Sequence, residues 1–535
     1  MNKAGFNTKT RFIAIFCILT LASSVLLGGC GVLQPVQPQI NDTTAVQPTG
    51  TAQQSNADVP AAEGRLEGPG FASGEDALLY ALSAIRSCDL EALVSCYAVE
   101  TVLERFNFED YYAYDGFRMY DDNFWPADGG FGTAMNRYTL EARVLLDAAL
   151  PFIGAVNGCF ADGLNPGVRG IKTYYTDTAN GGVNLDEYFA ALQGGEAERV
   201  LGTLRVTGGV FNVTEAYLAK AMEDGGQERY ENLLSRFEFY AKAYGADQRV
   251  SFGIPVNVDG LDCYFSVTAL NYGDRWYLLS VGNSFADNIG GFGLSNPGTE
   301  TADGLPAPAL PDVSSAGTLA ARRYEGPGFS SPEEAAKAYL EAVVALDPDA
   351  AVACYAVDRL ADGDLLAYRT SDLSENLMGG GTFLASAARI TLAASCATQL
   401  GRNYLCILDM VTYDEQEKHW YETIDGGDST SINTNMKKYP YARAQLHDLL
   451  NNHVIRVKLS QENLESIKLE TTRDDGTMMR AAKLGASDFA IVALPGNDLT
   501  LDVYVYTACF DGRWYVFPTF LKGWEGNGEH WMLYS

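Results

Sequence analysis

The same spacing of apolar residues occurs in two parts of the chain. After Ser73 and again after Ser331, apolar residues recur at intervals of three and four, which is the spacing of an amphipathic helix. The first set is Ala77, Leu78, Ala81, Leu82 and Ile85, and the second is Ala335, Ala336, Tyr339, Leu340 and Val343. The surrounding letters agree too, because residues 65–100 align without a gap with residues 323–358. A repeat this long predicts a duplicated globular unit rather than a solenoid.

Each of these helices has a clear start signal. Ser73 and Ser331 are the expected N-cap residues, Pro332 fits the first helical turn, and Glu334 is the expected acid of a capping box. A second start signal follows at Asp89 and at Asp347-Pro348. The short helix predicted after it ends in Cys-Tyr in both places.

The last third of each repeat alternates apolar and polar residues, as β-strands do. It closes on GDRWYLLSV at 273–281 and on DGRWYVFPT at 511–519, and turn pairs such as Asp-Gly divide the runs. Helices followed by an antiparallel sheet predict an α+β fold. We therefore expect two tandem domains, residues 65–287 (the first repeat) and 323–535 (the second repeat), with insertions in their centres and a Pro-rich linker at 288–322.

The N-terminal residues have the pattern of an export signal. Basic residues precede an apolar run over 12–27, and Leu27-Gly28-Gly29-Cys30 resembles the lipobox of bacterial lipoproteins. Residues 1–29 are thus a predicted lipoprotein signal peptide, and Cys30 is the predicted site of lipid attachment. An uncleaved membrane anchor is the alternative. Residues 30–64 lack aromatics and predict a flexible tether.

Charge and cysteine content narrow the possible partners. The formal net charge is −30 at pH 7, which repels phosphate backbones, so nucleic acid is not an expected partner. Ten cysteines in 535 residues are too few for a disulfide scaffold, and no C-x-x-C occurs. We expect attachment to the extracytoplasmic side of a bacterial membrane through the lipid at Cys30.

Several of these motifs together resemble a known domain family. The helix GFSSPEEAAKAYLEAVVALD, the second helix ending in Cys-Tyr, and the closing DGRWYV look like the nuclear transport factor 2-like fold, in particular the domain carried by many bacterial lipoproteins. The resemblance implies a curved antiparallel sheet wrapped around helices, forming a cone with an apolar pocket. It covers the start and end of each repeat, whereas 105–245 and 370–485 match poorly. Some enzymes of this fold use an Asp or an Asp/His pair in the cone, but no motif here places such a pair.

Four aromatic residues are candidates for lining a pocket or for packing in the core. Trp276 and Trp514 recur in the closing strand, and Tyr97 and Tyr355 recur at the end of the second helix. Buried aromatics usually serve the core, and a buried Tyr hydroxyl needs a partner, which a ligand or a backbone carbonyl can supply.

A stretch of the first repeat at 105–125 mixes aromatic with acidic residues and has no counterpart in the second. Rings that stack on sugars beside carboxylates that accept hydroxyl groups predict a glycan-binding surface. The alternative is a long loop that packs its own rings. The acids do not have the spacing of a calcium loop. The candidate ligand-binding residues are Tyr111, Tyr112, Tyr114, Tyr120 and Trp125.

These patterns favour a non-catalytic binding or interaction protein for a small molecule, an envelope glycan or another protein. No catalytic residue, cofactor or metal site is predicted, since the chain has no metalloprotease, Walker or nucleophile-elbow motif. One alternative is a small-molecule isomerase or hydrolase that uses the cone, and another is a spacer or assembly module.

Overall fold

The computed structural model describes most of the two repeats but not their full length. The described residues are 65–107, 110–111, 130–164, 176–177, 182–183, 195–280, 289–295, 305–313, 319–362, scattered positions between 389 and 400, 464, 467–469, 475–494, 503–518 and 533–534. The predicted signal peptide, Cys30 and the tether lie outside these ranges. No described helix has the length and apolar character to cross a membrane.

The first repeat opens with helices and closes with a sheet. Its helices are α1 (Gly74–Arg86), α2 (Leu90–Val94), α3 (Glu100–Arg105), α5 (Gly130–Val156), α7 (Glu196–Leu201) and α8 (Val213–Ala243). Its sheet has the order β3 (Arg205–Val206), β5 (Gln248–Val258), β6 (Leu261–Tyr272) and β7 (Arg275–Leu279), with β4 (Phe211–Asn212) on β5 and β8 (Phe292–Gly293) on β6. All pairings in this sheet are antiparallel. A separate small ladder joins β1 (Thr176–Asp177) to β2 (Gly182–Val183).

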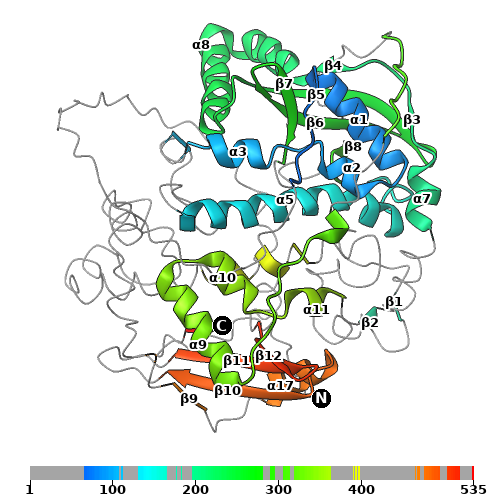
Figure 1. The fold of residues 1–535 in the computed structure, drawn as a ribbon. Helices are drawn as coiled ribbons and strands as arrows, with labels where there is room; N and C mark the ends of the chain where they lie inside the picture. The colour runs from blue at the N-terminus through cyan, green and yellow to red at the C-terminus, as the bar shows by residue number, and fades with distance from the viewer. Residues whose placement is uncertain are drawn as a thin grey trace, which may run out of the picture.

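The described part of the second repeat also opens with helices and closes with a sheet. Its helices are α9 (Pro332–Ala345), α10 (Pro348–Ala353), α11 (Val357–Asp362) and α17 (Asp475–Lys483), preceded by the 3-10 turn η3 (Leu319–Ala321). Its sheet runs β12 (Arg513–Val516), β11 (Val503–Phe510), β10 (Asp488–Leu494) and β9 (Lys468–Leu469), and β13 (Leu533–Tyr534) lies parallel to β11. Helices with two separate, mainly antiparallel sheets make the fold α+β, as the sequence predicted (Figure 1).

The predicted helix caps are confirmed. Ser73 Oγ accepts the Asp76 N–H at 3.0 Å, and Ser331 Oγ accepts the Glu334 N–H at 3.2 Å. Asp89 and Asp347 cap the next helices in the same way. The capping box is different from the prediction, however, because the Glu334 carboxylate accepts from the N–H and hydroxyl of Ser330 instead of the N–H of Ser331.

The two ends of each repeat are joined by equivalent contacts. Phe71 forms a backbone bridge with Trp276, and Phe329 forms the same bridge with Trp514. Tyr97 bridges Leu278, as Tyr355 bridges Val516. These pairs explain why the opening and closing motifs recur together.

A third equivalence lies at the end of the regions that matched poorly in sequence. Gly245 lies two residues after the end of α8 and Gly485 two residues after the end of α17, and both glycines have positive φ. In each case the N–H that follows the glycine closes the helix by donating to the carbonyl five residues earlier, at 2.9 Å in α8 and 3.0 Å in α17. The matching letters, AKAYGA and AAKLGA, were a signal that the sequence comparison missed.

Helix α5 lies between the two repeats. It packs on α2 and α3 of the first repeat and on α10 of the second (Figure 1). One continuous cluster of buried apolar side chains includes residues of both repeats, among them Leu145 of α5 and Val352 of α10. The two repeats therefore share a core.

The chain between the repeats also packs on the first repeat. Within the range predicted as a linker, β8 adds to the first sheet, with Phe292 fully buried. Further on, Ser83 of α1 donates to the Pro311 carbonyl at 2.5 Å. Parts of 288–322 are thus docked against the first repeat.

Candidate functional site

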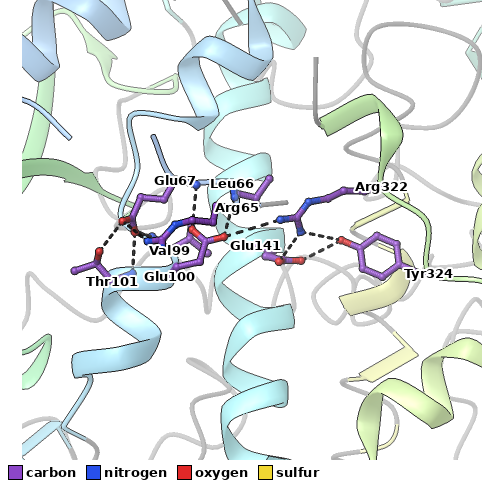
Figure 2. A network of polar contacts seen from close by, with 9 residues as sticks. All are labelled: Arg65, Leu66, Glu67, Val99, Glu100, Thr101, Glu141, Arg322 and Tyr324. Atoms are coloured by element: carbon purple, nitrogen blue, oxygen red, sulfur yellow. Dashed lines mark hydrogen bonds and ion pairs between the residues drawn. The ribbon is translucent and has the colours of Figure 1, made fainter. Parts of the chain in front are cut away.

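The buried acids at the start of the first repeat bind backbone groups. Glu67 accepts hydrogen bonds from the N–H of Val99 at 3.0 Å and from the N–H and hydroxyl of Thr101 at 2.8 and 2.5 Å (Figure 2). Glu100 returns the contact by accepting the N–H groups of Leu66 and Glu67 at 2.7 and 3.0 Å. Since leaving a buried polar group without a partner is costly, these bonds hold the N-terminal segment on the start of α3.

The second repeat contains the same reciprocal contact. Asp358, which aligns with Glu100, accepts the N–H groups of Tyr324 and Glu325, both at 3.0 Å. Glu325, which aligns with Glu67, accepts the Arg359 N–H at 3.0 Å. These acids have a structural role in both repeats.

A second set of polar contacts ties α5 to the second repeat. Arg322 Nη1 donates to Glu141 Oε1 at 2.6 Å, and the Tyr324 hydroxyl donates to Glu141 Oε2 at 3.0 Å (Figure 2). Arg322 and Glu141 are 4% and 1% exposed. Burial is the largest single effect and lowers the pKa of the Arg322 guanidinium, but Glu141 and Tyr324 together outweigh it and raise that pKa above its usual value.

One turn earlier, α5 contacts the second repeat again. The Tyr138 hydroxyl donates to Asp349 Oδ1 at 2.8 Å, and Arg137 forms an ion pair with the same carboxylate. Residues 137 and 141 lie on one face of the helix, as positions four apart do. This face of α5 is therefore fixed by Asp349 and Tyr324 of the second repeat and by Arg322, the last residue of the predicted linker.

A different side of α5 presents an acid to the interior of the first repeat. Ser280, at the end of β7, is buried and donates its hydroxyl to Asp147 Oδ2 at 2.5 Å. Burial first and the charge of Asp147 second raise the pKa of Tyr97 well above its usual value. The Tyr97 bridge to Leu278 places it beside the same strand end. We call Tyr97, Asp147 and Ser280 the polar cluster.

The equivalent place in the second repeat is filled with rings. Tyr355, the counterpart of Tyr97, is 0% exposed and packs edge-on against Tyr339, with 5.4 Å between ring centroids. Its pKa is raised by burial first and by Tyr339 second. Tyr97, in contrast, is partly exposed. The two repeats thus differ at the position where the cone was expected.

Sequence differences explain the contrast. Tyr339 aligns with Ala81, and Phe517 aligns with Leu279, so the second repeat carries larger side chains at both positions. Ser280 aligns with Pro518, which has no hydroxyl to donate. Sequence reasoning missed Asp147 because it belongs to no repeated motif, and it missed Ser280 because only the tryptophan of the closing motif GDRWYLLSV was singled out. Comparing the closing motifs position by position was a signal for Ser280, whereas no sequence signal pointed to Asp147.

The remaining candidates from the sequence lie as follows. Trp276 and Trp514 are partly buried, and Trp276 packs edge-on against Phe252 with ring centroids 6.2 Å apart. Tyr111 is 7% exposed and packs on Phe106 and Tyr244, so its ring belongs to the core. Tyr112, Tyr114, Tyr120 and Trp125 lie outside the described residues, and their role stays a prediction.

The polar cluster has groups that suit a neutral polar ligand or a cationic one. A carboxylate accepts hydrogen bonds, and the two hydroxyl groups beside it can donate or accept. Among the described residues, no group of three His, Cys, Asp or Glu side chains is placed to hold a metal ion.

Comparisons with known proteins give little further guidance. No protein-family model matches the chain, and no curated protein matches it. Among solved structures, the chain is similar to a cystatin-like protein from Ruminococcus gnavus ATCC 29149, with 13% identity and a TM-score of 0.43. The match covers 83% of this chain and 87% of that one.

Proposed function

We propose that this protein is a lipid-anchored, extracytoplasmic binding protein built from two nuclear transport factor 2-like repeats. The ligand is a small polar molecule or the end of an envelope glycan, held in the first repeat by the polar cluster. The observation that carries the proposal is the unequal pair of tyrosines: Tyr97 is only partly buried and bridges the strand end where Ser280 binds Asp147, whereas Tyr355 is fully buried against Tyr339.

The hydrogen bonds made by the other acids of the first repeat support the polar cluster as the binding site. Glu67 and Glu100 accept backbone N–H groups, and Glu141 binds Arg322 and Tyr324. Their hydrogen bonds hold segments of the chain together, which is a structural role. Asp147 instead accepts the hydroxyl of Ser280, which follows β7 at the strand end that Tyr97 bridges.

The chemistry of the cluster favours a ligand that carries hydroxyl groups. A carboxylate accepts two hydrogen bonds from neighbouring sugar hydroxyls, and the Tyr97 phenol can donate to a ring or carbonyl oxygen. Sugars of the cell envelope would be within reach of a protein that is anchored to the membrane at Cys30. The anchor and the ligand class are therefore consistent with each other.

The binding test uses the purified mature protein on a glycan array and in a pull-down with peptidoglycan. Asp147→Asn and Tyr97→Phe should each lose most of the signal. Tyr355→Phe is the matched control in the second repeat and should retain it. Equal binding by wild type and Asp147→Asn would place the ligand elsewhere, with the stretch at 105–125 the next surface to test.

The anchor has its own test. Replacing the predicted acylated residue, Cys30→Ala, should abolish acylation and maturation by signal peptidase II, so that the chain keeps its N-terminal apolar segment. Mass spectrometry of the wild-type N-terminus should find a diacylglyceryl group on Cys30. An unmodified Cys30 in membrane-bound protein would contradict the anchor.

The Asp147 and Tyr97 pair also keeps the enzymatic alternative open to experiment. A carboxylate beside a phenol can move a proton, which an isomerase or hydrolase of this fold would need. The same glycans should be examined by mass spectrometry after incubation with the protein. Recovery of unchanged glycan supports binding, and a converted product supports catalysis.

A further inference from the structure

We propose that the second repeat supports the site of the first, and that Arg322 and Asp349 are positioning residues that hold α5 so that Asp147 accepts the Ser280 hydroxyl at the strand end that Tyr97 bridges. The importance of this arrangement for ligands rests on the proposed function. The positioning itself is a property of the protein without any ligand.

One face of helix α5 contacts the second repeat, and a different face contacts the first repeat. Arg137, Tyr138 and Glu141 bind the second repeat, and Asp147 binds Ser280 of the first. Six residues separate positions 141 and 147, which at 3.6 residues per turn puts them about 120° apart around the helix axis. A rotation or shift of α5 that changes its contacts with the second repeat must therefore also move Asp147.

Directional contacts are what fix the rotation of a helix in a core. Apolar side chains around α5 stabilise burial but tolerate small shifts, because the hydrophobic effect is non-directional. The hydrogen bonds of Glu141 have donors from two side chains, Arg322 and Tyr324, and each has its own direction. The second repeat supplies the Tyr324 hydroxyl and the Asp349 carboxylate, and Arg322 directly precedes it in the chain.

The second repeat is suited to this role because its own interior is closed. Tyr339, Tyr355 and Phe517 are between 0% and 2% exposed. The repeat that supports α5 is thus the repeat whose equivalent position is filled by its own rings. If the repeats arose by duplication and then took separate roles, one supporting α5 and the other carrying the polar cluster, the structural contacts recur in both repeats while the polar cluster does not.

The test measures how strongly Asp147 acts on Tyr97 when the support is removed. The mature protein is labelled with 13Cζ-tyrosine, and the Tyr97 signal is assigned through Tyr97→Phe. In the wild-type background, Asp147→Asn should shift the Tyr97 signal. In an Asp349→Ala background, Asp147→Asn should shift it much less, since Asp147 has moved away.

Asp349 is a suitable position because its side chain is 43% exposed, so the variant should still fold. Asp511→Ala is the matched control: this acid pairs with Arg359 inside the second repeat and does not contact α5. The Asp511→Ala background should retain the full shift. An undiminished shift in the Asp349→Ala background would mean that packing alone positions Asp147, and the proposal would be wrong.

A second variant tests the buried pair without leaving one charge alone. Arg322→Met combined with Glu141→Leu removes both charges, whereas removing only one partner strongly destabilises a buried pair. The double variant should fold and show a reduced shift at Tyr97 on Asp147→Asn. A full shift in this folded variant would also overturn the proposal. Neither result depends on a ligand, so failure here is distinguishable from failure of the proposed binding function.

Discussion

The ring of Tyr339 packs edge-on against the ring of Tyr355, with 5.4 Å between their centroids. At the aligned positions the first repeat has Ala81 and Tyr97. The change from Ala81 in the first repeat to Tyr339 in the second thus decides whether a ring covers the tyrosine that recurs in both repeats. At this position the second repeat is filled by the rings of Tyr339 and Tyr355, whereas the first repeat has the hydrogen bond between Ser280 and Asp147 close by.

Removing the Tyr339 ring should destabilise the protein. Tyr339→Ala takes away a fully packed ring, and large-to-small changes of this size cost about 3 kcal/mol in the free energy of unfolding. Urea denaturation gives the value. Tyr217→Ala, at a ring that is 43% exposed on α8, is the control and should cost little. Equal effects for the two variants would mean that Tyr339 is not a core residue.

Gly328, which precedes the recurring Phe329, should tolerate no side chain. Gly328 has φ +70°, and a Cβ there would lie 2.5 Å from Cζ of Tyr515. Gly512 has φ +75° with open space around it, so it reports the backbone strain alone. Gly328→Ala should therefore lower the free energy of unfolding more than Gly512→Ala, which should cost about 1 kcal/mol. Similar costs for both would show that the tyrosine ring moves aside freely.

The serine cap of α9 should contribute a measurable part of the stability. Ser331→Ala removes the acceptor of the Glu334 N–H and should cost about 1 kcal/mol. Ser235→Ala, in the exposed middle of α8, is the control and should cost less. An unchanged urea midpoint for Ser331→Ala would argue against a capping role.

The sequence predicted the features that depend on neighbouring residues. Ser73 and Ser331 cap helices, and Asp511-Gly512 forms the turn of a hairpin, because caps and turns need only local chemistry. The polar cluster was out of reach for such reasoning. Ser280 and Asp147 are 133 residues apart in sequence, and Arg322 and Glu141 are 181 apart. Contacts of this kind depend on where α5 lies in the fold, and the sequence around α5 has no motif that fixes its position.

Alkaline pH should report on the polar cluster. Burial and then Asp147 raise the pKa of Tyr97, so native Tyr97 keeps its proton at a pH where the unfolded chain loses it. The stability from this difference is present below the unfolded pKa of about 10 and is lost as pH rises through the folded pKa. Asp147→Asn should lower the pKa of Tyr97, as followed by 13Cζ NMR. No change in the pKa would mean that the two groups do not interact.

Hydroxyl-radical footprinting of the intact mature protein tests the central claim most directly, because it compares the two equivalent tyrosines in one sample. The rate of oxidation at each ring, measured by mass spectrometry, depends on its contact with solvent. Tyr97 should be oxidised at a rate well above that of Tyr355, and Ala81→Tyr should slow the reaction at Tyr97 by covering it. Equal protection of Tyr97 and Tyr355 in the wild-type protein would contradict a site in the first repeat that the second repeat has closed.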